Sequence, residues 1–88
     1  MSKGIILFLT KNNQPAAPLG VFSAAKRLKN AIDQVVSVHK TDDAFKERTW
    51  EARMNDPRFT KMVDVVKFND GQEWIYHSQE FTTNQAPV

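Results

Sequence analysis

The strongest structural signal in the pattern of apolar and polar positions is a pair of largely apolar runs within residues 63–81. The segment Asn69–Asp70–Gly71 separates the runs, and its residue types favour a tight turn. The pattern predicts two antiparallel strands joined as a hairpin. A two-residue turn would place Phe68 opposite Glu73. A three-residue turn with a left-handed glycine would place Lys67 opposite Glu73, and we favour this register because opposite charges then face each other.

This register gives the predicted hairpin two apolar faces. One face carries Val66, Phe68, Trp74 and Tyr76, and the other carries Val63, Val65, Ile75 and His77. One face must cover the core of the domain. The other also needs a cover, either a second helix, a second copy of the chain or a partner, because an exposed aromatic face is unusual on a soluble monomer.

The first half of the chain predicts a strand, a loop and a helix. Residues 4–10 are nearly all apolar, which indicates a central strand buried on both faces. Residues 11–20 contain two prolines and read as a loop, after which residues 19–22 return as a short strand beside the first. Ser23 is a suitable N-cap for a helix over residues 24–35, whose apolar positions fall on one stripe.

The middle of the chain, residues 34–54, carries weaker periodicity. Residues 34–40 alternate in polarity, which fits a short strand or an extended linker. Thr41, Asp42 and Asp43 suit the start of a second helix over residues 43–54, although the apolar residues of this segment make no clean stripe. The prediction is one small α+β domain over residues 1–88. It has an antiparallel β-sheet, a C-terminal β-hairpin, two helices mainly on one face and a frayed tail at residues 82–88.

The amino-acid composition excludes sites that depend on cysteine and argues against a transmembrane helix. The 88 residues include no cysteine, which excludes disulfides, zinc–thiolate sites and iron–sulfur clusters. No run approaches the roughly 20 apolar residues of a transmembrane helix, and nothing reads as a signal sequence, so we expect a cytoplasmic protein with no membrane contact. The net charge is +2, but residues 1–40 carry +5 and residues 41–88 carry −3.

Candidate catalytic chemistry is sparse. His39 and His77 are the only histidines, and neither stands at metal-ligand spacing with another ligand. No nucleophile, phosphate-binding or dinucleotide-binding motif is present. We therefore predict no enzyme, no catalytic residue, no metal and no cofactor. A small enzyme or ligand-binding domain would require the fold to place one of the histidines beside a carboxylate in a deep pocket.

Two groups of residues could contact nucleic acid. Lys26, Arg27 and Lys29 cluster near the start of the first predicted helix, where an anion or a nucleic acid could bind. Bases could stack on exposed aromatic rings. The candidates are Trp50, Trp74, Tyr76 and Phe81. Solvation of the helix face and packing of the aromatic rings in the core explain the same residues.

The opening of the chain resembles a type of small phage and bacterial protein. These proteins begin with a hydrophobic strand and a polar loop, then Gly, Val or Ile, Phe and Ser, then a helix with central alanines. The matching residues here are Leu19–Gly20–Val21–Phe22–Ser23 and the following helix, within residues 4–32. The resemblance implies an α+β fold and a phage-encoded accessory protein. It implies no activity and no site residues.

These observations predict a small non-enzymatic interaction or regulatory protein, phage-encoded, that binds and modulates another protein of its host. The predicted contact or dimer face is Val66, Phe68, Trp74 and Tyr76, with a protein partner or a homodimer as the occupant. The alternative is a nucleic-acid-binding module that uses the basic face of the first helix.

Overall fold

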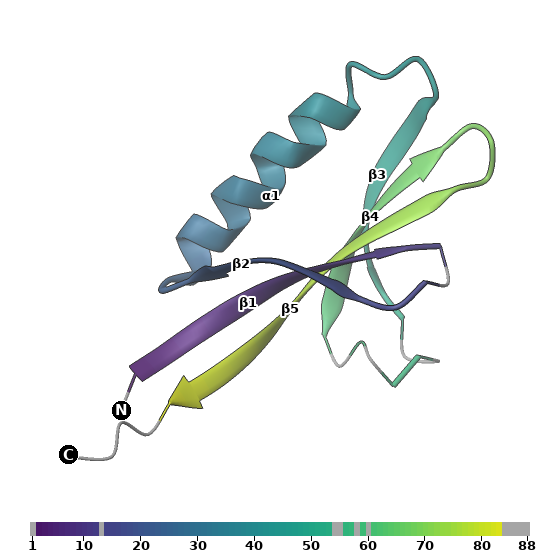
Figure 1. The fold of residues 1–88 in the computed structure, drawn as a ribbon. Helices are drawn as coiled ribbons and strands as arrows, with labels where there is room; N and C mark the ends of the chain where they lie inside the picture. The colour runs from purple at the N-terminus through teal and green to yellow at the C-terminus, as the bar shows by residue number, and fades with distance from the viewer. Residues whose placement is uncertain (1, 13, 54–55, 58, 60, 84–88) are drawn as a thin grey trace.

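The computed structural model describes residues 2–12, 14–53, 56–57, 59 and 61–83, and it consists of one antiparallel sheet with a helix on one face (Figure 1). The sheet has five strands in the order β2-β1-β5-β4-β3. In chain order the elements are β1 (Ser2–Lys11), β2 (Ala17–Phe22), α1 (Ala25–His39), β3 (Phe45–Ala52), β4 (Met62–Phe68) and β5 (Glu73–Thr83).

The predicted fold class is wrong in its balance of helix and sheet. The chain is mostly antiparallel sheet, and α1 is the single helix among the described residues. The β4–β5 pair is not a separate C-terminal hairpin, because β5 lies at the centre of the sheet and also pairs with β1 from Ser2↔Thr83 to Lys11↔Trp74. Thr82 and Thr83 of the predicted frayed tail belong to this ladder, and residues 84–88 lie outside the described residues.

The predicted second helix is strand β3. Its ladder with β4 pairs Arg48 with Val66 and Trp50 with Asp64. The side chains that suited a helix start make a turn instead: Asp42 Oδ1 accepts a hydrogen bond from the backbone N–H of Ala44, at 2.9 Å. This turn feeds the chain into the sheet. Residue 54, the last of the predicted helix, lies outside the described residues.

Helix α1 is longer than predicted, since residues 34–39 continue it rather than forming a strand or linker. Its buried stripe runs through Leu28, Ile32 and Val36, at the spacing of one helix face. Burial of this stripe outweighs the weak helix propensity of the valines. The N-cap is Ala24 rather than the predicted Ser23, and no side-chain hydrogen bond caps this end.

The predicted hairpin register is confirmed. Lys67 lies opposite Glu73, and Gly71 has a φ of 89°, the left-handed conformation that the three-residue turn requires. The predicted pairing of β2 beside β1 is also confirmed, with the strand beginning two residues earlier than expected. β1 lies between β2 and β5, as its apolar run indicated.

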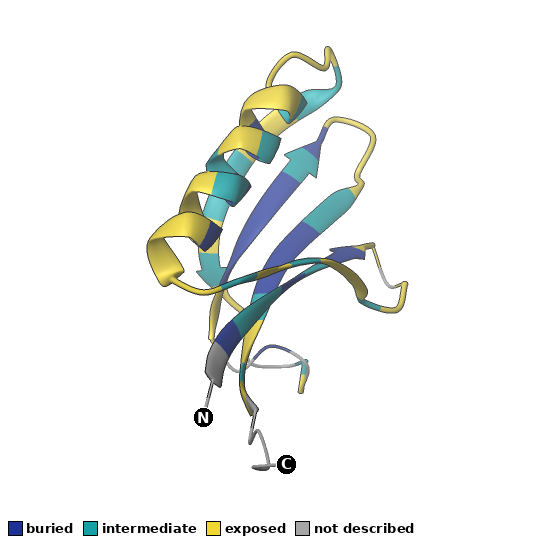
Figure 2. Ribbon diagram, turned by 60° about the vertical axis from the view of Figure 1, so that its left-hand side comes forward, coloured by how far each residue is buried: buried dark blue, intermediate teal, exposed yellow. Residues whose placement is uncertain are grey.

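The main core lies between the sheet and α1. Side chains from three strands meet the helix stripe there, and the buried members are Leu7, Leu9, Leu28, Ile32, Val36, Val66, Phe68 and Tyr76. Figure 2 shows the resulting gradient, with buried residues on the strands beneath the helix and exposed residues on its outer side.

The second face of the sheet is covered by the chain itself. Phe59, from the connection between β3 and β4, packs in a smaller core with Val63, Val65 and Ile75. Beside this core, ion pairs cross the same face of strands β3, β4 and β5. They join Lys67 to Glu47 and Glu51, and Arg53 to Glu51 and Glu73. The second apolar face therefore has a cover within the described residues.

Candidate functional site

An apolar groove of about 620 Å³ runs between α1 and strands β3 and β4. The helix and β3 are joined by a short loop at one end and separate toward the other (Figure 1). We call the first the loop end and the second the open end. The groove is lined by Ala25, Leu28, Lys29, Ile32, Arg48, Thr49, Trp50, Met62, Asp64, Tyr76, His77 and Ser78.

One wall of the groove is formed by α1, through residues of the buried stripe that packs on the sheet. Leu28 and Ile32 are buried one turn apart, and Ala25 precedes them at the start of the helix. A small side chain at this first position leaves room at the open end. The helix wall is therefore apolar and is held in place by the main core.

The sheet wall carries two exposed apolar side chains. Trp50 is 63% exposed and Met62 is 41% exposed. Trp50 pairs with Asp64, and Ala52 pairs with Met62, so both side chains point to the helix side of the sheet. β3 is an edge strand, so nothing in the described sheet lies beyond Trp50. A large apolar surface is thus exposed at the rim of an apolar groove.

An ion-pair triad lies toward the loop end. The Arg48 guanidinium donates to Asp64 Oδ1 through Nε, at 2.9 Å, and to Asp33 Oδ1 through Nη1, at 3.0 Å. Burial lowers the pKa of Arg48, but the hydrogen bonds and charges of Asp64 and Asp33 outweigh this and raise it. The triad joins β3 and β4 to the middle of α1 and engages both carboxylates.

Basic groups lie toward the open end. Lys29 lines the groove, and Lys26 lies one turn earlier on the neighbouring face of α1. Arg27 points elsewhere, because successive helical residues are rotated by about 100°. All three side chains are exposed, as the sequence indicated. The helix separates the predicted basic set: Lys29 lines the groove, and Lys26 lies beside it on α1.

The predicted contact face lies mainly beneath α1. Val66, Phe68 and Tyr76 are at most 8% exposed and belong to the main core. Trp74 is partly buried, with the Lys11 ammonium 4.2 Å from its ring centroid. Tyr76 also lines the groove, whereas a partner could contact Val66 and Phe68 only if the helix moved away from the sheet.

His39 attaches the end of α1 to the sheet. Its Nε2 lies 2.6 Å from the Tyr76 hydroxyl, and its ring meets Phe68 and Trp74 edge-on. Burial lowers the pKa of His39, partly offset by Asp42, and raises the pKa of Tyr76 to about 12. His39 thus acts as a packing and hydrogen-bonding group between helix and sheet.

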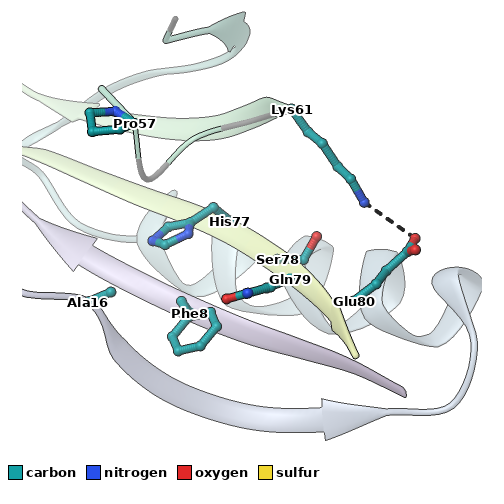
Figure 3. Close-up of a pocket in the computed structure, with 8 residues that line it drawn as sticks. All are labelled: Phe8, Ala16, Pro57, Lys61, His77, Ser78, Gln79 and Glu80. Atoms are coloured by element: carbon teal, nitrogen blue, oxygen red, sulfur yellow. Dashed lines mark hydrogen bonds and ion pairs between the residues drawn. The ribbon is translucent and has the colours of Figure 1, made fainter. Parts of the chain in front are cut away.

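The ring of His77, a residue that also borders the groove, lies on the other face of the sheet, in a pocket of about 540 Å³ (Figure 3). Its Nε2 is 2.9 Å from Thr10 Oγ1, its ring stacks on Phe8, and Phe59 meets it edge-on. The pocket also holds Glu80, whose carboxylate pairs with Lys61 (Figure 3). These contacts give His77 a packing role.

The described residues contain no group of three or more side chains placed to hold a metal ion. No helix among them is long and apolar enough to cross a bilayer.

Comparison with protein-family models, with curated proteins and with solved structures found no match to this chain. The groove is therefore interpreted from its own geometry. As a site residue, Trp50 was predicted only as a ring that could stack bases, and Met62 was not predicted at all. The alternation of Arg48, Trp50 and Ala52 with Glu47, Thr49 and Glu51 was the signal that could have identified β3 and placed Trp50 on its helix-facing side.

Proposed function

We propose that this chain is a small non-enzymatic interaction protein that binds a segment of another protein in the groove between α1 and strands β3 and β4. The observation that carries the proposal is the exposure of Trp50 and Met62 at the rim of that groove. The proposal keeps the predicted class of function and moves the contact surface from beneath the helix to its side.

The energetics favour a binding surface. A tryptophan with 63% exposure leaves on the order of 100–150 Å² for a partner to cover. At about 25 cal/mol per Å², its burial would contribute roughly 3 kcal/mol to association. Tryptophans in apolar pockets frequently dominate interface energies. The rim of the groove therefore offers one strong anchor and a neighbouring flexible methionine.

The polar groups of the groove favour binding over acid–base catalysis. Asp33 and Asp64 both accept hydrogen bonds from Arg48. Both carboxylates therefore already have a hydrogen-bond and charge partner within the protein. What remains for a ligand is apolar contact along the walls and the ammonium of Lys29.

One observation favours nucleic acid as a second candidate: Lys29 and Trp50 line the same groove, so a phosphate and a stacked base could bind together. Such binding would fall steeply with salt. We favour protein because the rest of the lining is mainly apolar and Arg48 is already neutralised by carboxylates. Fluorescence anisotropy with single-stranded oligonucleotides over a range of salt concentrations tests this alternative.

We further propose a biological role and a cellular location for the protein. Residues 4–32 resemble the opening of small phage proteins, which motivates a role in modulating a host protein. The absence of cysteine motivates a cytoplasmic location.

The experiment is affinity capture from a lysate of the cells that carry the gene, with quantitative mass spectrometry. Wild type is compared with Trp50→Ala and with Val21→Ala, which removes an equally exposed apolar side chain on the far edge strand β2. We expect a protein that wild type and Val21→Ala capture and Trp50→Ala loses. Equal capture by all three variants would contradict the proposal.

A further inference from the structure

We infer that the segment bound in the groove is an acidic, apolar peptide, with its carboxylate at the open end. This inference rests on the proposed function and specifies the chemistry of the partner. It follows from the charges at the two ends of the groove, which differ in sign.

The open end is positive. Lys29 lines it, and Lys26 lies one turn earlier on α1. The N-terminus of α1 is at the same end, since Ala25, its first residue, also lines the groove. No acidic residue occupies the first turn of α1, and no side chain caps it. The backbone N–H groups of that turn and the positive end of the helix dipole therefore add to the two ammonium groups.

The loop end is slightly negative. Asp33 and Asp64 share one guanidinium, which leaves a formal charge of −1 on the triad. Asp33 is the more exposed of the two carboxylates, with 46% of its side chain accessible. An anionic group at this end would meet repulsion, and a neutral or basic group would not.

This difference in charge sets the direction of the bound segment. Its Asp or Glu side chain, or its terminal carboxylate, lies near Lys26 and Lys29. Its apolar side chains lie between the helix wall at Leu28 and the exposed Trp50. Its uncharged or basic residues lie nearest the triad. A nucleic acid, with a phosphate at every step, would place negative charge at both ends of the groove.

The test begins with a random peptide library displayed on phage and selected against the full chain. Selected peptides are synthesised, and their binding is measured by fluorescence anisotropy with wild type and Trp50→Ala. We expect Trp50-dependent binders that combine apolar residues with an excess of Asp and Glu over the unselected library.

Charge reversal then tests the assigned end. Lys29→Glu should weaken binding of a selected peptide about tenfold at low salt, because it replaces an attraction at close range with a repulsion. Arg27→Glu is the matched control, since it changes the net charge equally on the same exposed helix but away from the groove. We expect less than about a twofold change for Arg27→Glu.

The possible results distinguish a failure of the acidic-peptide inference from a failure of the proposed binding function. Trp50-dependent peptides without an acidic excess, or with equal affinity for Lys29→Glu and Arg27→Glu, overturn the inference and leave the proposed function standing. If no peptide binds, or if no binding depends on Trp50, the proposed function fails as well. Trp50-dependent binding of single-stranded DNA assigns the groove to nucleic acid. A dimer in light scattering that Trp50→Ala dissociates assigns it to a second copy. Either result overturns the assignment of the groove to an acidic, apolar peptide.

Discussion

Arg48 links three elements of the fold, so its replacement has a predictable cost. Arg48→Met keeps most of the apolar stem and removes the guanidinium that pairs with Asp64 and Asp33. Asp64 is 5% exposed, so the substitution leaves a nearly buried carboxylate without its counter-ion. Breaking a buried pair in this way costs about 3–5 kcal/mol.

The surroundings of Arg48 place the expected cost at the lower end of that range. Its side chain is 28% exposed, so water screens part of the charge. We expect a loss of about 3 kcal/mol in the free energy of unfolding, which for a domain of this size lowers Tm by about 12–24 °C. Asp33→Ala is the comparison. Its carboxylate is 46% exposed, so we expect a loss below about 1 kcal/mol.

The assay is urea denaturation at neutral pH, followed by circular dichroism, for each single variant and for Arg48→Met with Asp64→Leu. The double variant replaces both charges with apolar groups of similar size, which usually restores stability after loss of a buried pair. We therefore expect it to be more stable than Arg48→Met alone. If Arg48→Met costs no more than Asp33→Ala, or if the double variant shows no recovery, Asp64 does not depend on Arg48 as argued.

Three further predictions follow from single contacts. Gly71→Ala should lose about 1 kcal/mol in chemical denaturation because φ is 89° there, whereas Gly20→Ala, which meets only an ordinary contact with Phe22, should lose less. Tyr76→Ala should lose about 3–5 kcal/mol in the same assay because the ring is 2% exposed, and a smaller effect would show that α1 does not cover this face. Burial lowers the pKa of His39 in the folded state below its ordinary value of 6.5, so the unfolded chain takes up this proton first as pH falls. The folded state should therefore lose stability below about pH 6.5. The Tm of His39→Gln should decline less over this range than that of wild type.

The features that the sequence predicted correctly are determined by nearby residues. The turn at residues 69–71 contains the glycine that a left-handed position requires, and the opposite charges of Lys67 and Glu73 indicated the register. The stripe of α1 was likewise visible in the spacing of its apolar residues. Its true end was missed because the last turns contain valines and a histidine, and the burial of Val36 and His39 against the sheet holds them in the helix.

The features that it predicted incorrectly depend on distant residues. β3 is a strand because the edge of β4 accepts it and because Arg48 reaches Asp64, sixteen residues away. Nothing within residues 43–54 reveals that partner edge. Local propensity therefore does not distinguish a helix from a strand in this segment, and pairing with β4 determines that it is a strand.

The candidate site was only partly predictable for the same reason. The sequence revealed two apolar faces on the β4–β5 pair but not which structures cover them. Phe59 and the ion pairs of Lys67 and Arg53 cover one face, and α1 covers the other. The groove arises where α1 and β3 separate, which is a property of the fold rather than of any segment. Lys26 and Lys29 were identified beforehand because charge is visible in sequence.

The most direct test of the proposed groove uses nuclear magnetic resonance on the isotope-labelled chain, titrated with a bound peptide or captured partner segment. Trp50 and Trp74 each give an indole N–H signal. Trp50 is at the rim of the groove and Trp74 packs against the main core. We predict that the Trp50 indole signal and the backbone signals of Ala25, Lys29 and Met62 shift while the Trp74 indole signal remains in place. Shifts confined to the opposite face, around Phe8 and Phe59, would contradict the account.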